Sequence, residues 1–338
     1  MKILVTGSAG HLGEALVRTL QPMGHTVLSL DVLASPFTTH TGSIADRETA
    51  RACMRGVDAV LHAATLHKPH VATHGRQAFV DVNVTGTLNL LEAAVAERVG
   101  AFVFTSTTSA FGDALVPPPG EPAAWITEEV VPRPKNIYGA TKTAAEDLCQ
   151  LFSRNEGLPC LVLRTSRFFP EEDDDPARRA SVCDANLKVN EFLHRRVDLA
   201  DVVAAHLCAL QAAPRLRFDR FIVSATTPFT PDDLAALRTD AAAVLRRRVP
   251  RFEALYAARG WKPPATIDRV YVNDRARQRL GWRPQLDFAH VLERLERGED
   301  PRSDLARVVG SKGYHRSRAD TDPVPPRAGT PVEPDARA

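Results

Sequence analysis

The chain has few cysteines, no long apolar run and almost no excess of one charge sign. Its five cysteines are scattered and form no C-x-x-C pair, which fits reduced thiols in a cytoplasmic protein. No apolar run is long enough to span a membrane, and the first residues lack the pattern of a signal peptide. A net charge of +2 gives no indication of a nucleic-acid partner. The cysteines are Cys53, Cys149, Cys160, Cys183 and Cys208.

Segments with the patterns of strands and helices alternate along the first half of the chain. Hydrophobic residues make up 44% of the 338 residues and charged residues 25%, which is a globular profile. Repeated β-α units with short connections predict a parallel sheet that binds its ligands at the carboxyl ends of the strands. We predict an α/β fold, a Rossmann-like doubly wound parallel sheet with a smaller C-terminal α/β part. The predicted strands cover residues 3–5, 26–30, 58–62, 101–105 and 159–164, and the predicted helices 14–20, 47–54, 79–97 and 138–155.

Three glycines follow the first predicted strand at three-residue spacing. Gly7 permits a tight turn, Gly10 lets a pyrophosphate approach the backbone, and Gly13 lets the next helix pack closely on the strand. The spacing G-x-x-G-x-x-G is a variant of the dinucleotide-binding fingerprint. Asp31 ends the second strand, where a carboxylate accepts hydrogen bonds from ribose hydroxyls and repels a 2′-phosphate, which favours NAD over NADP. The alternative is an aspartate that only stabilises a turn.

Tyr138 and Lys142 stand four residues apart and therefore share one face of a predicted helix. A free tyrosine has a pKa near ~10, but a nearby ammonium and a positively charged nicotinamide ring both favour the phenolate. Tyr138 could then take a proton from a substrate alcohol. A hydroxyl from Thr107, at the end of the fourth strand, could orient the substrate oxygen. The spacing Y-x-x-x-K alone is common by chance. Its position in the sequence after the glycine turn, Asp31, Asn83 and Thr107 supports a catalytic role.

Six stretches of the chain together resemble the extended short-chain dehydrogenase/reductase family, in its NAD-dependent epimerase/dehydratase branch. They are TGSAGHLG, LHAAT, DVNVTGTLNLLEAA, FVFTSTTSAFG, IYGATKTAAE and LRTSRFF, and the resemblance runs from residue 1 to about residue 284. It implies that Thr107, Tyr138 and Lys142 are catalytic. It also implies NAD as the cofactor, bound by Tyr138, Lys142 and the set Gly7, Gly10, His11, Leu12, Gly13, Asp31, Ser43, Ile44, Ala63, Ala64, Asn83 and Thr105.

Three departures from that family bear on the cofactor and on the substrate. Ser43 stands where the family often has an aspartate that contacts adenine. Thr108 and Ser109 follow Thr107 where sugar-nucleotide dehydratases place an Asp-Glu pair, so elimination of water lacks its acid and base. Arg167 and Phe168 occupy the region where many members carry Phe-Asn, and Arg167 could bind an anionic group instead.

The second half of the chain carries the candidate substrate contacts. By the resemblance, residues 186–196 help to line the substrate pocket, and an arginine there could bind a phosphate or a carboxylate. Pairing of these arginines with the acidic run at residues 171–175 is an equal alternative, and that run otherwise fits a solvated loop. We interpret Trp282 as a packing residue. The candidate substrate contacts are Thr108, Arg167, Asn186, Arg195 and Arg196.

His67, His70 and His74 lie after the third strand and raise the possibility of a metal site. Pro69 interrupts them and no carboxylate-histidine signature accompanies them, so we expect a loop near the active site and no metal.

The domain prediction places an NAD-binding Rossmann domain at residues 1–165. Residues 166–311 form a substrate-binding part with some segments returning to the sheet, and residues 312–338 form a poorly ordered tail whose removal should leave activity near normal. Helices are also expected at residues 198–210, 231–247 and 274–280.

The sequence thus predicts NAD-dependent hydride transfer at a secondary alcohol or ketone, most simply by a nucleotide-sugar or related epimerase. A dehydrogenase or reductase of a non-sugar substrate remains the main alternative, and a non-catalytic nucleotide-sensing protein is a further one. By the resemblance, a homodimer could form through residues 79–97 and 143–155. The expected partner is otherwise a small-molecule substrate, with no nucleic acid and no membrane.

Overall fold

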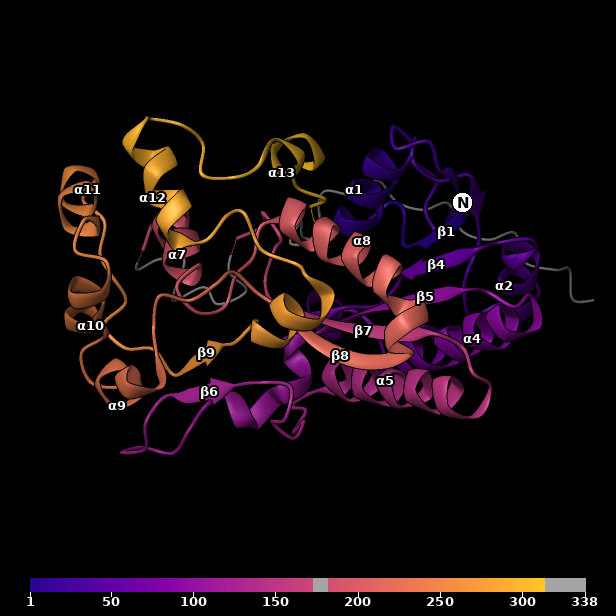
Figure 1. The fold of residues 1–338 in the computed structure, drawn as a ribbon, viewed down its shortest axis with the longest axis horizontal. Coiled ribbons are helices and arrows are strands. Elements are labelled where there is room, and N and C mark those ends of the chain that lie inside the picture. Colours follow the sequence, from indigo (N-terminus) through magenta and orange to yellow (C-terminus); the bar gives the residue numbers. More distant parts are fainter. Residues whose placement is uncertain (173–181, 314–338) are drawn as a thin grey trace, which may run out of the picture.

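The computed structural model describes residues 1–172 and 182–313, and its centre is a seven-stranded sheet (Figure 1). The strand order is β3-β2-β1-β4-β5-β7-β8, and every neighbouring pair is parallel. This confirms the predicted doubly wound α/β fold. The strands are β1 (Lys2–Thr6), β2 (Thr26–Asp31), β3 (His40–Thr41), β4 (Ala59–His62), β5 (Ala101–Thr107), β7 (Cys160–Thr165) and β8 (Phe218–Val223).

Both faces of the sheet are covered by helices, which explains why its strands are apolar without alternation. Ile3 and Val5 of β1 pack in the cluster that contains α1 and α8, whereas Leu4 packs on the opposite face with α2, α4 and α5. All three side chains are fully buried. The helices of the two layers are α1 (His11–Leu20), α8 (Leu199–Leu216) and α13 (Asp304–Val309), and α2 (Arg47–Met54), α4 (Gly86–Ala96) and α5 (Ile137–Asn155).

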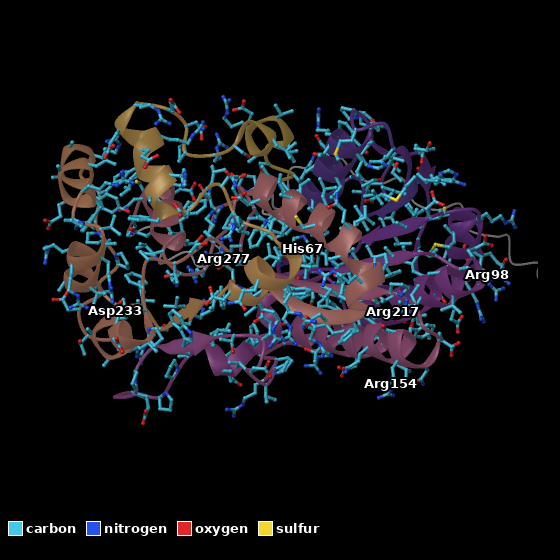
Figure 2. All side chains as sticks on the ribbon, viewed as in Figure 1. His67, Arg98, Arg154, Arg217, Asp233 and Arg277 are labelled. Atoms are coloured by element: carbon cyan, nitrogen blue, oxygen red, sulfur yellow. The ribbon has the colours of Figure 1, made fainter. Side chains whose placement is uncertain are left out.

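A smaller part lies beyond the carboxyl ends of the strands, at the left of Figure 1. It contains a two-stranded parallel sheet and its own apolar core. Figure 2 shows Asp233 in this part, Arg98, Arg154 and Arg217 at the far side of the main sheet, and His67 between them. The elements of this part are β6 (Ala124–Ile126), β9 (Arg269–Tyr271), α7 (Asp184–Glu191), α9 (Leu234–Leu237), α10 (Ala241–Arg248), α11 (Phe252–Arg259) and α12 (Phe288–Glu296).

Three predicted helices differ from the structure in detail. The helix expected at residues 79–97 begins as α3 (Arg76–Phe79) and continues through a π-helical turn, Val80–Thr85, into α4. The helix expected at residues 231–247 is wrong as a single element. It breaks after α9 because the Asp240 side chain accepts the Ala243 N–H and starts α10 as a new helix. The helix expected at 274–280 includes a π-helical turn, Ala276–Leu280.

The helix expected at residues 198–210 and the expected packing residue Trp282 both belong to the core of the fold. The helix runs further than expected, as α8, and packs on β5 and β7. Trp282 is buried, and its indole N–H donates to the Asp201 carbonyl oxygen at 3.0 Å, as expected of a packing residue. In the part of the chain that the structure describes, each helix is too short or too polar to span a bilayer.

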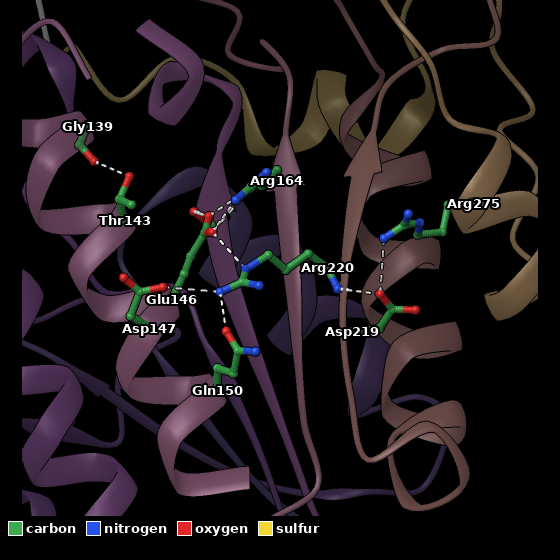
Figure 3. A network of polar contacts seen from close by, with 10 residues as sticks. Gly139, Thr143, Glu146, Asp147, Gln150, Arg164, Asp219, Arg220 and Arg275 are labelled. Carbon is green, nitrogen blue, oxygen red and sulfur yellow. Dashed lines mark hydrogen bonds and ion pairs between the residues drawn. The ribbon is translucent and has the colours of Figure 1, made fainter. Parts of the chain in front are cut away.

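A buried carboxylate on α5 joins that helix to three strands of the sheet (Figure 3). Glu146 accepts a hydrogen bond from Ser106 Oγ of β5 at 2.5 Å. It also accepts from Arg164 of β7, whose Nη2 lies 2.6 Å from Glu146 Oε2, and Arg220 of β8 approaches to 3.3 Å. Because the Glu146 and Arg164 side chains are almost fully excluded from solvent, neither charge is solvated by water.

We predict that Glu146→Gln strongly lowers the free energy of unfolding. The variant leaves the Arg164 guanidinium buried without its charge partner, a change that costs about 3–5 kcal/mol in known buried pairs. Urea denaturation followed by circular dichroism measures the loss. The matched control is Asp147→Asn, because Asp147 is largely exposed and pairs only with Arg220 within this network, so about 0–1 kcal/mol is expected. Equal stability of the two variants would contradict the assigned role of Glu146.

Candidate functional site

A cavity of about 760 Å³ opens at the carboxyl ends of the parallel strands, where the fold predicts ligand binding. Its volume lies within the range of small-molecule sites. Most of the predicted site residues line it, although they come from segments spread along more than half of the chain. The lining members are Gly7, Gly10, His11, Leu12, Gly13, Asp31, Ser43, Ile44, Ala63, Ala64, Thr105, Thr107, Thr108, Tyr138, Arg167 and Arg195.

The glycine turn between β1 and α1 forms one end of this cavity. Gly7 has a φ of +78°, and a Cβ atom there would lie 2.7 Å from the Ala64 backbone nitrogen. A Cβ on Gly13 would lie only 1.9 Å from the Gly7 carbonyl oxygen. Gly10 is the N-cap of α1 and brings no side chain over the helix N-terminus. The turn thus offers backbone N–H groups and a positive helix end to an anion.

Asp31 lies beside the glycine turn at the end of β2. One carboxylate oxygen accepts the Ala9 N–H at 2.9 Å, and the other accepts the Leu33 N–H at 2.9 Å. The turn-stabilising role considered from the sequence is therefore present, and the same side chain also lines the cavity. Both features are compatible, because a carboxylate has about four acceptor sites.

Ser43 and Ile44 follow β3 and form the adjoining wall. The Ser43 hydroxyl accepts the Ala45 N–H at 3.1 Å, and the Ile44 side chain is buried. Asn89 of α4 donates to the carbonyl oxygens of Ile44 and Ala45 at 3.0 and 3.1 Å, and thereby fixes this wall. Asn89 carries no sequence signal for this role, because only the packing of α4 brings it to the loop after β3.

Tyr138 lies in the first turn of α5 and faces Thr107 at the end of β5. Asn136 starts this helix by accepting the Gly139 N–H at 3.0 Å, which fixes the position of the turn. Burial raises the pKa of Tyr138 to about 12, and a hydrogen bond with Thr107 offsets part of that increase. The phenol is therefore protonated at neutral pH and suited to donate a proton.

Lys142 lies one turn further along α5 and does not itself line the cavity. Its ammonium donates to the Thr105 carbonyl oxygen at 2.6 Å and lies 3.9 Å from the centre of the Phe104 ring. Burial lowers the pKa of Lys142 to about 7. The charge of this side chain is consequently sensitive to its surroundings, and its contact on β5 lies two residues before Thr107.

Asn83 also lies behind the cavity wall and not in it. Its side chain accepts the Leu66 N–H at 2.8 Å and donates to Thr141 Oγ1 at 3.1 Å. Asn83 therefore joins the segment after β4 to α5, so that it holds the wall in place.

Three of the arginines expected at the substrate end meet at one buried carboxylate. Glu191 lies 2.7 Å from both Arg195 Nη2 and Arg196 Nη1, and 3.5 Å from Arg167 Nε. Burial alone would raise the pKa of Glu191, but the three guanidinium groups lower it to about 2. Arg167 and Arg195 line the cavity, so this cluster presents cationic groups to a ligand.

Two of the expected substrate residues do not line the cavity. Arg196 donates to the Phe169 carbonyl oxygen as well as to Glu191. Asn186 accepts the Lys262 N–H at 2.9 Å and donates to the Lys262 carbonyl oxygen at 3.1 Å, so its amide is used in packing. A substrate contact by either residue stays a prediction, and the structure gives each side chain a partner within the protein. Of the acidic run, Glu171 pairs with His11, and residues 173–175 lie outside the described residues.

The three histidines after β4 border the same cavity. The His67 ring stacks on Phe169 with ring centres 5.5 Å apart, and the His67 backbone N–H donates to His70 Nδ1 at 3.0 Å. His74 lies in the wall beside them. Over residues 1–172 and 182–313, no group of three metal-binding side chains has a suitable arrangement.

Several cavity residues were not predicted from the sequence, among them Lys135, Arg269, Tyr271 and Lys312. Arg269 and Tyr271 reach the site through β9, whose pairing with β6 joins segments about 145 residues apart and leaves no local sequence signal. Lys135 follows Pro132 and Pro134 in the connection that leads into α5. Lys312, which the sequence placed in the tail, also lies in the cavity wall, whereas residues 314–338 of that tail are outside the described part.

Comparisons with known proteins agree with this geometry. Residues 3–218 match the model of the NAD dependent epimerase/dehydratase family. The chain is 26% identical to a 3 beta-hydroxysteroid dehydrogenase/Delta 5-->4-isomerase of Mycobacterium tuberculosis, over 86% of this chain and 88% of that protein. It is 28% identical to a UDP-glucose 4-epimerase of Rhizobium meliloti, over 86% and 94%. A solved short-chain dehydrogenase/reductase superfamily protein from Agrobacterium tumefaciens with bound NAD is 25% identical, with a TM-score of 0.61 over 88% of this chain and 98% of that one.

We predict that Asp31→Ala weakens NAD binding and narrows the preference for NAD over NADP by about tenfold or more. The change removes a ribose acceptor and the charge that repels a 2′-phosphate. Titration of both dinucleotides by tryptophan fluorescence measures the two affinities. Asp58→Ala is the control, because Asp58 precedes β4 at the opposite end of the sheet. Tighter binding of NADP than NAD to the unmutated protein would overturn the role given to Asp31.

Proposed function

Because this chain belongs to the NAD-dependent epimerase/dehydratase family, we propose that it moves hydride between NAD and a secondary alcohol or ketone of a nucleotide-sugar or related substrate. The observation that carries this proposal is the meeting of Thr107, Tyr138 and the glycine turn at one cavity. The cofactor assignment itself follows from the family. The assignment of individual residues to binding and catalysis is our proposal.

The residues at the glycine turn fit NAD. Backbone atoms occupy the space that a Cβ on Gly7 or Gly13 would fill. The turn is therefore compact enough for a pyrophosphate to approach its backbone N–H groups. Ala63 and Ala64 keep the facing strand end small. Asp31 would hold the adenosine ribose, and Ile44 would pack beside the adenine. When bound, NAD supplies the hydride acceptor or donor.

Tyr138 would move the proton that accompanies the hydride. In the direction of reduction, its protonated hydroxyl donates to the developing alkoxide. In the direction of oxidation it must accept a proton, and positive charge nearby lowers the cost of the phenolate. The Lys142 ammonium, one turn further along α5, would stabilise the Tyr138 phenolate. The Thr107 hydroxyl would orient the substrate oxygen that gains or loses the proton. These roles use the positions that the structure gives the three side chains.

The same ketone can be reduced again on its other face, so the net reaction that we propose is an epimerisation. The similarity to a UDP-glucose 4-epimerase over most of both chains supports this choice. Thr108 and Ser109 occupy the positions next to Thr107 and bring hydroxyl groups to the wall instead of an acid and a base. This chemistry favours hydride transfer over elimination of water. Arg167 and Arg195 would bind an anionic group of the substrate.

A specific observation supports the alternative, a dehydrogenase of a non-sugar substrate. Part of the cavity wall is apolar and formed by Leu66, Leu115, Val116, Phe168 and Phe169. A flat apolar ligand would pack on such a wall, and the similarity to a hydroxysteroid dehydrogenase is consistent with it.

We also propose that the protein is a cytoplasmic homodimer. All five cysteines are free thiols, which suits a reducing compartment. For the dimer, α4 and α5 lie side by side on one face of the sheet, and Leu151 of α5 is 38% exposed. A second copy would cover this side chain in a four-helix arrangement.

We predict that Tyr138→Phe lowers turnover by about 10²–10⁴-fold, because general acid-base catalysis contributes on that scale. NAD affinity should change little, since the ring remains. Steady-state kinetics and a binding titration separate the two effects. Tyr256→Phe is the control: Tyr256 is also buried and donates to Asn190 Oδ1, but it does not line the cavity. Turnover by Tyr138→Phe near that of the control would remove Tyr138 from the mechanism.

We predict that NAD remains bound when the protein is purified without added cofactor. An epimerase reuses its own hydride and gains nothing from releasing NAD between turnovers. Mass spectrometry of the denatured supernatant identifies the cofactor, and labelled NAD added during turnover measures its exchange. Exchange in every turnover, with NADH appearing in solution, would favour the dehydrogenase alternative.

A further inference from the structure

The last described residues of the chain return to the glycine turn. Helix α13 packs on α1, and the backbone then turns at Gly310, where φ is +61°. We call Gly310–Gly313 the C-terminal strap. The strap is bound by Glu171, a residue after β7. One carboxylate oxygen, Oε1, accepts hydrogen bonds from Ser311 Oγ at 3.0 Å and from the Lys312 N–H at 2.8 Å.

The strap reaches α1 through two separate contacts. Glu171 Oε1 also lies 2.9 Å from Nε2 of His11, the first residue of that helix. The Lys312 ammonium pairs directly with Glu14, which is buried in the first turn and is also bound by Arg18. Burial alone would raise the pKa of Glu171, but the hydrogen bond and charge of His11, together with the Lys312 N–H, lower it to about 2. The carboxylate that holds the strap is thus ionised throughout the physiological range.

These contacts lie at the anion-binding end of the cavity. His11, Glu171 and Lys312 line the same cavity as Gly7, Gly10 and Gly13. Glu171 therefore lies close to the place where the diphosphate of NAD would sit, and Glu14 follows Gly13 directly in the first turn of α1. Unpartnered, they would repel it. Lys312 joins Arg18 in pairing with Glu14, and the strap N–H and hydroxyl bind Glu171, so the strap offsets negative charge at this end of the site and brings Lys312 into its wall.

We propose that the C-terminal strap is a clamp that retains NAD by closing the diphosphate end of its site. The inference rests on the proposed function only for the position of NAD. It assigns a cofactor-retaining role to residues about 300 positions away from the glycine turn. The clamp would slow dissociation of NAD without contacting the reacting atoms.

Two truncated proteins test the clamp. One ends after Gly313 and keeps the strap, and the other ends after Val309 and loses it while retaining α13. NAD dissociation is measured without substrate, by displacing bound NADH with excess NAD and following its fluorescence. We expect the protein that ends after Gly313 to match the full chain within about twofold, and the protein that ends after Val309 to release NADH about tenfold faster or more, the scale set by one lost charge-assisted hydrogen bond.

Two full-length variants keep the test decisive if the shorter protein fails to fold. Lys312→Met preserves the length of the side chain and removes its pairing with Glu14, and Ser311→Ala removes one bond to Glu171. Faster release from Lys312→Met, with a smaller effect of Ser311→Ala, supports the clamp. Unchanged release from the strap-deleted protein, or from both full-length variants, overturns it. Failure of the full chain to bind NAD would instead contradict the proposed function.

Discussion

The buried carboxylate of Glu146 holds together the elements that carry the proposed chemistry. It lies on α5, one turn after Lys142 and two turns after Tyr138, and it binds Ser106, the residue between Thr105 and Thr107 on β5. The Arg164 guanidinium ties the same carboxylate to β7. The separation between the tyrosine helix and the threonine strand is therefore fixed by a charged contact that excludes water. Charge at this depth constrains geometry more tightly than apolar packing, because hydrogen bonds are directional.

Close backbone packing sets the opposite end of the cavity. Gly7 lies so near to Ala64, and Gly13 so near to Gly7, that a side chain at either glycine would displace the backbone. This compactness exposes the N-terminus of α1, which attracts anions. The nearby carboxylates Glu14 and Glu171 would counteract that attraction, and Lys312 and His11 lie against them. The glycine-turn end of the cavity is therefore an assembly of the first and last described segments of the chain.

The arginine cluster at the cavity wall uses charge differently. Arg167, Arg195 and Arg196 gather around Glu191, and two of them also reach the cavity wall. Beside them lie the aromatic rings of Phe168 and Phe169. A site that combines guanidinium groups with an apolar wall suits a ligand with an anionic group and a flat or ring-shaped body. Nucleotide sugars have this combination, and the apolar portion also accommodates other alcohols.

The sequence by itself determined the fold class, the cofactor and the edge of the sheet at which the site lies. These depend on local patterns: an apolar strand, the glycine turn after it, the carboxylate that ends β2, and Tyr138 and Lys142 at helical spacing. Backbone sterics and side-chain periodicity act over a few neighbouring residues, so the patterns that they produce can be recognised in the sequence. The tertiary structure alone decided which polar side chains face the cavity. Asn83, Asn186 and Arg196 are used in packing, whereas Arg269, Tyr271 and Lys312 arrive from distant segments. No sequence pattern marks such residues, because their roles depend on contacts between elements that meet only when the chain has folded.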